Sequence, residues 1–201
     1  MNVAIFASGN GTNFEVLTKH FQNGDIPGKE ALLFCDHPDA YVIKRAQRLG
    51  VPYETFTVKS CGSKQAYEEK IMAVLKQYDI DFIVLAGYLR IIGPTILDKY
   101  EGSIVNLHPA WLPEYPGLHS IERAFADHRK ETGVTVHYID SNLDAGTIIA
   151  QRHVPIYPDD TVDTLETRVH ETEHELYPET VKKILTERIA KEKTTNETCI
   201  S

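Results

Sequence analysis

The sequence predicts an α/β fold: a single domain built around a doubly wound, mostly parallel sheet. Short apolar runs alternate with helical patterns, and few hairpin signals precede the centre of the chain. Such alternation is typical of parallel strands joined by helices that cover both faces of one sheet. The length of 201 residues suits one such domain with a substantial core. We predict a domain over residues 1–190 and a polar, disordered tail over residues 191–201.

Composition excludes several classes of function. A formal net charge of -8 argues against a surface for nucleic acid or for an anionic membrane. Cys35, Cys61 and Cys199 are scattered and form no C-x-x-C pair, so we expect neither a disulfide scaffold nor a cysteine zinc site. The first residues lack the features of a signal peptide, and no apolar run approaches the length of a membrane span. We therefore expect a cytoplasmic protein that acts on small molecules.

The first apolar run, residues 3–7, is predicted to be a buried strand that ends in a glycine-rich turn with the letters S-G-N-G-T-N. Bare backbone N–H groups and a helix N-terminus at such a turn form an anion site, most often for phosphate. Gly9 and Gly11 match the start of a dinucleotide fingerprint, but Phe14 occupies the third glycine position. A monophosphate needs no third glycine. A tight turn that caps itself is the alternative.

Three further strands are expected before the centre. They are predicted at residues 31–34, 51–56 and 81–86. Three helices are predicted as well: the first ends near residue 49, the second spans about residues 63–78, and the third starts at Pro94. Asp36 ends the second strand, where a nucleotide-binding enzyme keeps an acid for the ribose, so that function stays open. The segment at residues 87–92 places apolar side chains and free backbone groups at a strand end. It suits a flat heterocycle, and core packing explains it equally well.

The central stretch holds the residues that we single out for chemistry. Residues 104–107 are predicted to be a buried strand, and Asn106 and His108 lie one residue apart, so their side chains share a face. Prolines at 109, 113 and 116 then require a stiff loop. Asn donates hydrogen bonds to an oxyanion, and His titrates near neutral pH. We expect the reaction centre here, with a protonated His108 beside the Asn106 amide.

A short helix at about residues 121–126 and strands at 133–139 and 147–150 are predicted next. Asp144 lies in the turn between these strands, where Asp often caps its own loop. As a carboxylate beside His108, it would instead raise the pKa of that histidine and orient the ring. His137 either faces the same site or belongs to the core or the surface.

Two motifs resemble the signatures of the formyltransferases that use 10-formyltetrahydrofolate. The first is N-x-H-P-x-x-L-P-x-Y-x-G at residues 106–117, and the second is G-x-T-x-x-x-x-D-x-x-L-D-x-G at residues 133–146. The resemblance covers about residues 1–185 and implies a Rossmann-like formyltransferase fold with 10-formyltetrahydrofolate as co-substrate and no metal. It also implies that Asn106, His108 and Asp144 are the catalytic residues.

The resemblance assigns binding residues as well. The glycine loop is similar to that of the members that formylate the amine of glycinamide ribonucleotide in purine synthesis. There it takes the substrate phosphate, through positions that match Gly11, Thr12 and Asn13. A late helix in these members contacts the ribose and phosphate at the positions of His170 and Glu173. The positions implied for folate binding are Lys64, Leu89, Arg90, Ile91, Ile92, Asn106, Asp140 and Asp144.

Departures from the family pattern leave the shape of the central loop and the affinity for the folate tail open. They are Ala110, Trp111, Glu114, Lys64 and His170. Alternative substrates also remain. An amino sugar nucleotide is possible as acceptor, although the loop favours a simple phosphate. A transfer RNA formyltransferase would need a further domain and a basic surface. A non-catalytic nucleotide-binding module would leave the three catalytic candidates without a role.

The last predicted helix begins near residue 160, is interrupted at Pro178 and resumes to about residue 190. It contains a literal H-E-x-x-H at residues 170–174, the pattern of zinc proteases. No third histidine follows, although Glu175 or Glu179 could supply a carboxylate ligand. Short motifs match often by chance in a chain rich in His and Glu, so we favour a site without metal.

Overall fold

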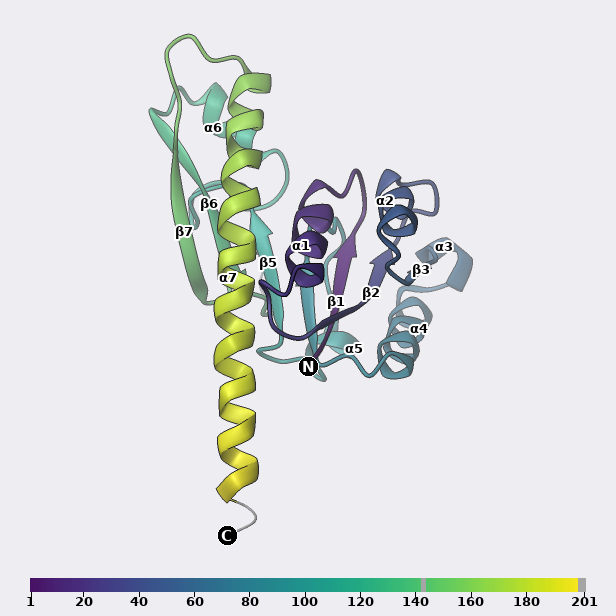
Figure 1. Cartoon of the computed structure of the whole chain (residues 1–201). Coiled ribbons are helices and arrows are strands. Elements are labelled where there is room, and N and C mark those ends of the chain that lie inside the picture. Colours follow the sequence, from purple (N-terminus) through teal and green to yellow (C-terminus); the bar gives the residue numbers. More distant parts are fainter. Residues whose placement is uncertain (142–143, 199–201) are drawn as a thin grey trace.

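A computed structural model describes residues 1–141 and 144–198, and it confirms the predicted α/β fold (Figure 1). Seven strands form one sheet in the order β3-β2-β1-β4-β5-β6-β7. The strands are β1 (Asn2–Ala7), β2 (Lys29–Cys35), β3 (Tyr53–Thr55), β4 (Phe82–Leu85), β5 (Ile104–His108), β6 (Glu131–Tyr138) and β7 (Ile148–Pro155). The helices are α1 (Thr12–Gln22), α2 (Tyr41–Leu49), α3 (Val58–Cys61), α4 (Lys64–Gln77), α5 (Pro94–Leu97), α6 (Ser120–Ala126) and α7 (Val162–Thr198).

The sheet has a parallel part and an antiparallel part. β1 to β5 pair in parallel, whereas β6 is antiparallel to β5 and β7 is antiparallel to β6. Parallel strands that are covered on both faces have continuous apolar sequences, and for this reason the first strands could be predicted from the sequence. Because all parallel strands point the same way, the loops after β1, β2, β4 and β5 meet at one edge of the sheet.

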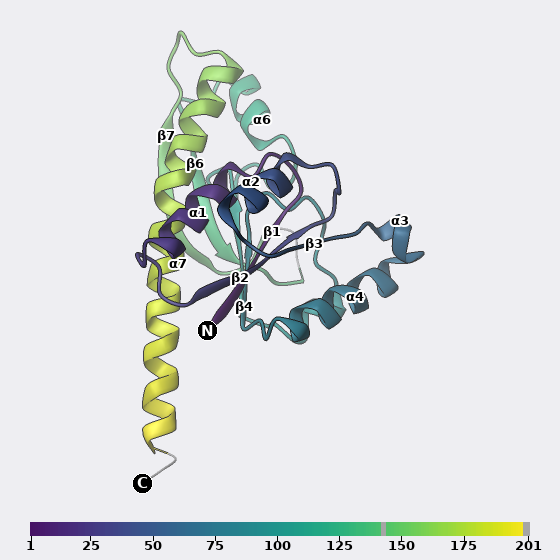
Figure 2. The ribbon, with the colours of Figure 1, turned by 45° about the vertical axis from the view of Figure 1, so that its right-hand side comes forward.

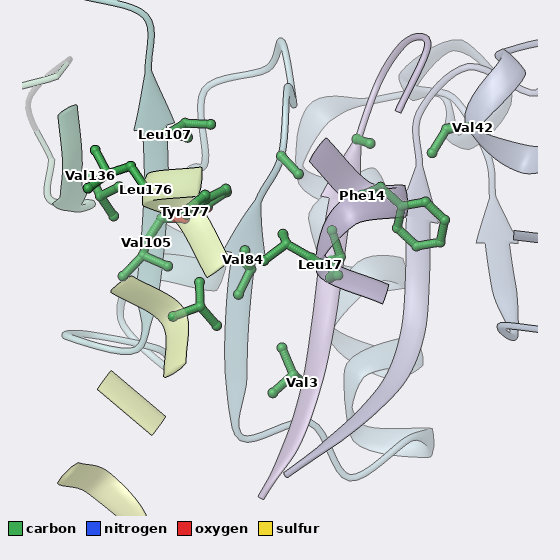
Figure 3. Packing of buried hydrophobic residues seen from close by; sticks show 14 of the residues in the cluster. Val3, Phe14, Leu17, Val42, Val84, Val105, Leu107, Val136, Leu176 and Tyr177 are labelled. Atoms are coloured by element: carbon green, nitrogen blue, oxygen red, sulfur yellow. The ribbon is translucent and has the colours of Figure 1, made fainter. Parts of the chain in front are cut away.

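Helices cover both faces of this sheet (Figure 2). Alternate residues of β1 enter two different cores: Ile5 packs with α1, α2 and α7, and Phe6 packs with α4 and α5. In the first core, Leu17 of α1 and Tyr177 of α7 lie over Val84 and Val105 of the central strands (Figure 3). The central strands are thus fixed from both sides, and the edge of the sheet that holds the loops rests on a rigid base.

The long helix α7 differs from the prediction, because it runs through Pro178 without a break. A proline inside a helix lacks one backbone hydrogen bond. Packing offsets that loss here, since Tyr177 and Val181 on either side are fully buried and the Tyr177 hydroxyl donates to the carbonyl of Leu85 at 2.7 Å. The proline therefore marks no boundary.

The helix α7 continues into the segment predicted as a tail. It ends at Thr198, and its last turns extend past the body of the domain (Figure 1). The segment A-K-E-K at residues 190–193 consists of good helix formers, which continue a helix already started by packing. Residues 199–201 of the predicted tail lie outside the described residues, as do Asn142 and Leu143 of the second signature. No helix in the described part of the chain is long and apolar enough to cross a membrane.

Candidate active site

The polar residues singled out in the centre of the chain lie at the end of β5, where the parallel and antiparallel parts of the sheet meet. Asn106 pairs with His137 of β6 in the antiparallel register. The His137 ring is fully buried, and its Nδ1–H donates to the carbonyl of Tyr138 at 2.9 Å. Its Nε2 atom lies 3.3 Å from the amide nitrogen of Asn106. His137 therefore faces the site, beside the Asn106 amide.

His108 is almost entirely buried, with both ring nitrogens directed at acceptors. Nε2 donates to the carbonyl of Tyr115 at 2.9 Å, and Nδ1 lies 3.5 Å from Oδ2 of Asp144. Burial lowers the pKa of His108 below its ordinary value, and the Tyr115 carbonyl and Asp144 oppose this shift without cancelling it. We predicted a raised pKa and a protonated ring from Asp144 alone. That prediction is wrong for the net shift, because it left out the desolvation of the imidazole.

Asp144 connects the two histidines to the central loop. Its Oδ2 accepts from the backbone N–H of Gly117 at 2.8 Å, and its Oδ1 lies 3.6 Å from Nε2 of His137. Burial raises the pKa of Asp144, but the contacts with His137, Gly117 and His108 outweigh it and hold the pKa below its usual value. The carboxylate is therefore charged at neutral pH. The structure brings Asn106, His108 and Asp144 together, and it adds His137.

The glycine loop after β1 is held by close packing. Gly11 has φ of +79°, and a Cβ built on it would lie 2.3 Å from Cγ2 of Val42 in α2. Both the backbone conformation and the contact require glycine. Arg45 of α2 donates from Nε to the carbonyl of Asn10 at 2.8 Å and binds the Asn10 side chain as well. The loop that leads into α1 is thus clamped against α2.

The late helix α7 meets the first turn of α1, directly after the glycine loop. Asn13, next to Thr12 in the first turn of α1, donates to Oε2 of Glu173 at 2.9 Å, and His170 donates to the same oxygen at 2.8 Å. This hydrogen bond raises the pKa of His170. The Oδ1 atom of Asn13 is buried and has no hydrogen-bond partner among the described residues. A buried acceptor without a partner is unusual, because its desolvation is not compensated by a donor from the described residues.

The segment after β4 forms one wall of a cavity of about 390 Å³ against α4. The cavity is lined by Val58, Lys64, Tyr67, Glu68, Tyr88, Leu89, Arg90, Ile91, Ile92 and Ile96. Leu89 and Ile91 are 66% and 69% exposed, so core packing does not account for them, whereas Ile92 is buried. Asp140 is exposed just after β6 and does not line this cavity.

The residues that depart from the family pattern find partners of their own. Trp111 stacks on His153 with ring centroids 3.7 Å apart, against Gly133, where a Cβ would be 2.9 Å from the indole. Glu114 accepts hydrogen bonds from Arg129 at 2.6 and 2.8 Å. Ala110 is fully buried, and Lys64 lies 3.8 Å from Glu68. The loop thus keeps a defined shape with this set of side chains.

The H-E-x-x-H motif has other uses in this fold. His170 is bound to Glu173, and the candidate third ligands, Glu175 and Glu179, both accept from Arg152, at 2.9 and 2.8 Å. Burial lowers the pKa of His174. Within residues 1–141 and 144–198, no three or more His, Cys, Asp or Glu side chains are arranged to hold a metal ion.

Comparison with known proteins gives one family. A family model described as formyl transferase matches residues 1–181. Phosphoribosylglycinamide formyltransferase of Bacillus subtilis (strain 168) is 43% identical over 182 residues, which cover 90% of this chain and 93% of that protein. The crystal structure of phosphoribosylglycinamide formyltransferase from Bacillus halodurans superposes with a TM-score of 0.89 at 48% identity, covering 92% of this chain and 95% of that one. Glycinamide ribonucleotide transformylase 1 from Geobacillus kaustophilus gives a TM-score of 0.89 at 50% identity, covering 92% and 98%.

Proposed function

The chain belongs to the formyl transferase family, and we propose that it transfers the formyl group of 10-formyltetrahydrofolate to the amine of phosphoribosylglycinamide in purine synthesis. The observation that carries this proposal is the cluster of Asn106, His108 and Asp144 at the sheet edge that also carries a clamped glycine loop and a cavity with an apolar rim. One end of this arrangement suits a phosphate, and the other suits a flat heterocycle. The names of the relatives support the same pair of substrates.

The first step of the reaction forms a bond between the amine nitrogen and the formyl carbon. The formyl oxygen becomes an oxyanion, and the Asn106 amide is the donor assigned to it. One N–H of that amide points to His137, which leaves the second for the oxygen. A donor of this kind is typically worth about 3–4 kcal/mol in the transition state.

The second step breaks the bond between that carbon and N10 of the folate. The attacking amine must lose a proton, and N10 must gain one. A neutral His108, which its lowered pKa favours, takes the first proton and delivers one to N10. The charged Asp144 stabilises the imidazolium that exists between these two transfers. One ring nitrogen has to exchange its protein acceptor for the substrate, so the ring or the Tyr115 carbonyl moves as the substrates enter.

The phosphate end is assigned to Gly11, Thr12 and Asn13, with His170 and Glu173 beside the ribose. The folate end is assigned to Lys64 and the segment from Leu89 to Ile92, with Asn106, Asp140 and Asp144 at its reactive end. The alternative of a nucleotide-binding module needs a free carboxylate at Asp36. That carboxylate is taken by Ser8, His37 and Arg90 instead, which argues against a ribose there.

A turnover assay tests the proposal. Purified protein with phosphoribosylglycinamide and 10-formyltetrahydrofolate should release tetrahydrofolate and formylated ribonucleotide in equal amounts. An amino sugar nucleotide in place of the ribonucleotide is the control acceptor. Turnover of the sugar nucleotide alone would contradict the proposed acceptor, and no formyl transfer to either amine would contradict the proposed reaction.

A further inference from the structure

A buried carboxylate at the end of β2 supports the wall of the donor cavity. Asp36 is fully buried, and its Oδ1 accepts from the Ser8 hydroxyl at 2.6 Å and lies 3.0 Å from Nδ1 of His37. Its Oδ2 accepts from Nε of Arg90. Burial raises the pKa of Asp36, but the hydrogen bonds from Ser8, His37 and Arg90 outweigh it and lower the pKa. Asp36 and Arg90 therefore form an ion pair at neutral pH.

The same group is tied to the backbone of the cavity wall. The Ser8 hydroxyl donates to Asp36 and accepts from the backbone N–H of Leu89 at 2.9 Å. The Ser8 N–H donates to the carbonyl of Gly87 at 3.0 Å. The ends of β1 and β2 and the start of the segment after β4 are thus joined through one carboxylate.

Arg90 keeps part of its binding capacity free. Its Nε is used by Asp36, and its guanidinium carbon lies 6.0 Å from the centre of the Tyr67 ring. Among the residues that the structure describes, its two terminal nitrogens have no hydrogen-bond partner. Arg90 lines the cavity together with Lys64, and its side chain is 39% exposed. A guanidinium fixed along one edge is well placed to bind a carboxylate with the other.

We propose that Asp36 is a positioning residue that holds Arg90 in the orientation in which its terminal nitrogens bind the glutamate carboxylate of the formyl donor. This inference rests on the proposed function. Tetrahydrofolate carries its glutamate far from N10, so the effect concerns donor affinity and leaves the chemistry alone. Arg90 without Asp36 keeps its charge but loses the fixed direction of its donors.

The test is Asp36→Asn in the full chain. Asn fills the same space and still accepts from Ser8, but it removes the ion pair with Arg90. Two donors are compared: 10-formyltetrahydrofolate and 10-formyltetrahydropteroate, which lacks the glutamate. We expect KM for the first donor to rise roughly tenfold, as the loss of one charge-assisted contact implies. KM for the second donor, KM for the ribonucleotide and kcat should change less than about twofold, which is within the ordinary scatter of kinetic constants. Asp160→Asn, which removes a carboxylate bound to Arg168 far from the cavity, is the matched control.

A double-mutant cycle adds the readout that a purely structural role would not give. In an Arg90→Ala background, Asp36→Asn should have no further effect on KM for the glutamate-bearing donor, because the residue through which it acts is gone. Equal increases of KM for both donors, or an undiminished effect in that background, would overturn the inference.

If Asp36→Asn does not fold, Arg90→Lys provides the same test. It keeps the charge but lacks the planar fork that binds Asp36 along one edge and presents fixed donors on the other, so it too should raise KM for the glutamate-bearing donor alone. An unchanged KM would refute the role of Asp36. If the wild-type protein turns over neither donor, the proposed function fails, and equilibrium binding of the two donors to the same variants still decides the inference.

Discussion

The two ends of the candidate site are built in different ways. At the proposed phosphate end, Val42 packs against Gly11, Arg45 binds Asn10, and Asn13 and His170 share the buried carboxylate of Glu173. At the donor end, exposed apolar side chains surround a cavity whose cations keep free donors. A small anion can be held by backbone that packing fixes, whereas a large donor needs a surface that adapts. Substitutions at the first end should therefore affect stability, and those at the second should affect KM.

The proposed catalytic cluster should give the largest effect. His108→Ala is expected to lower kcat by about 10²–10⁴-fold, the usual range for loss of a general acid or base. Melting temperature and substrate KM should change little by comparison. His20→Ala, which removes an exposed histidine bound to Asp25, is the control. Turnover near the wild-type rate in a folded His108→Ala protein would remove the proposed mechanism.

The partner of His108 should give a smaller loss and a change in pH dependence. Asp144 raises the pKa of His108 against the effect of burial, so Asp144→Asn should lower that pKa further. The limb of the kcat profile that follows His108 then moves to lower pH, and kcat falls by about 10-fold or more. The measurement is kcat from pH 5 to pH 9. A profile that keeps its position would mean that Asp144 only caps its turn.

At the phosphate end, Gly11→Ala should act through stability. The added Cβ meets Val42 at a positive φ, so the free energy of unfolding should fall by about 2 kcal/mol or more. A bulkier residue such as Val would be worse, and it would not separate binding from folding. Combining Gly11→Ala with Val42→Ala should recover only a small part of the loss, because the Cγ2 contact is removed, whereas the Cβ of residue 42 stays 2.6 Å from the added Cβ and the positive φ remains. Additive losses in thermal melts would show that the contact with Cγ2 of Val42 is unimportant.

At the donor end, Leu89→Ala should leave the melting temperature almost unchanged, because the side chain is 66% exposed. KM for 10-formyltetrahydrofolate should rise about three- to tenfold from the lost apolar contact, with KM for the ribonucleotide unaltered. Leu118→Ala, at another leucine that is 67% exposed but outside this cavity, is the control. Equal changes in the two KM values would contradict the prediction that Leu89 contacts only the formyl donor.

Local patterns in the sequence determined the order of strands and helices, the glycine loop and the pairing of Asn106 with His108 at a strand end. These features depend on interactions between residues close in sequence. The alternation of side chains along a strand and a glycine at a turn therefore indicate them directly. For the same reason, the predicted interruption at Pro178 was wrong. It rested on local propensity, and the packed helix α7 outweighed it.

The tertiary structure alone decided how distant groups act on one another. His137 joined the site through the antiparallel register of β5 and β6, which no local signal records. Burial lowers the pKa of His108, whereas the Tyr115 carbonyl and Asp144 raise it. Of these three causes, the sequence indicated only Asp144. From the sequence, Asp36 could be an acid that binds a ribose, but Ser8 and Arg90, which follow two other strands, bind its carboxylate. Desolvation and contacts across the sheet edge depend on which strands lie side by side, and that is fixed only when the whole sheet has formed.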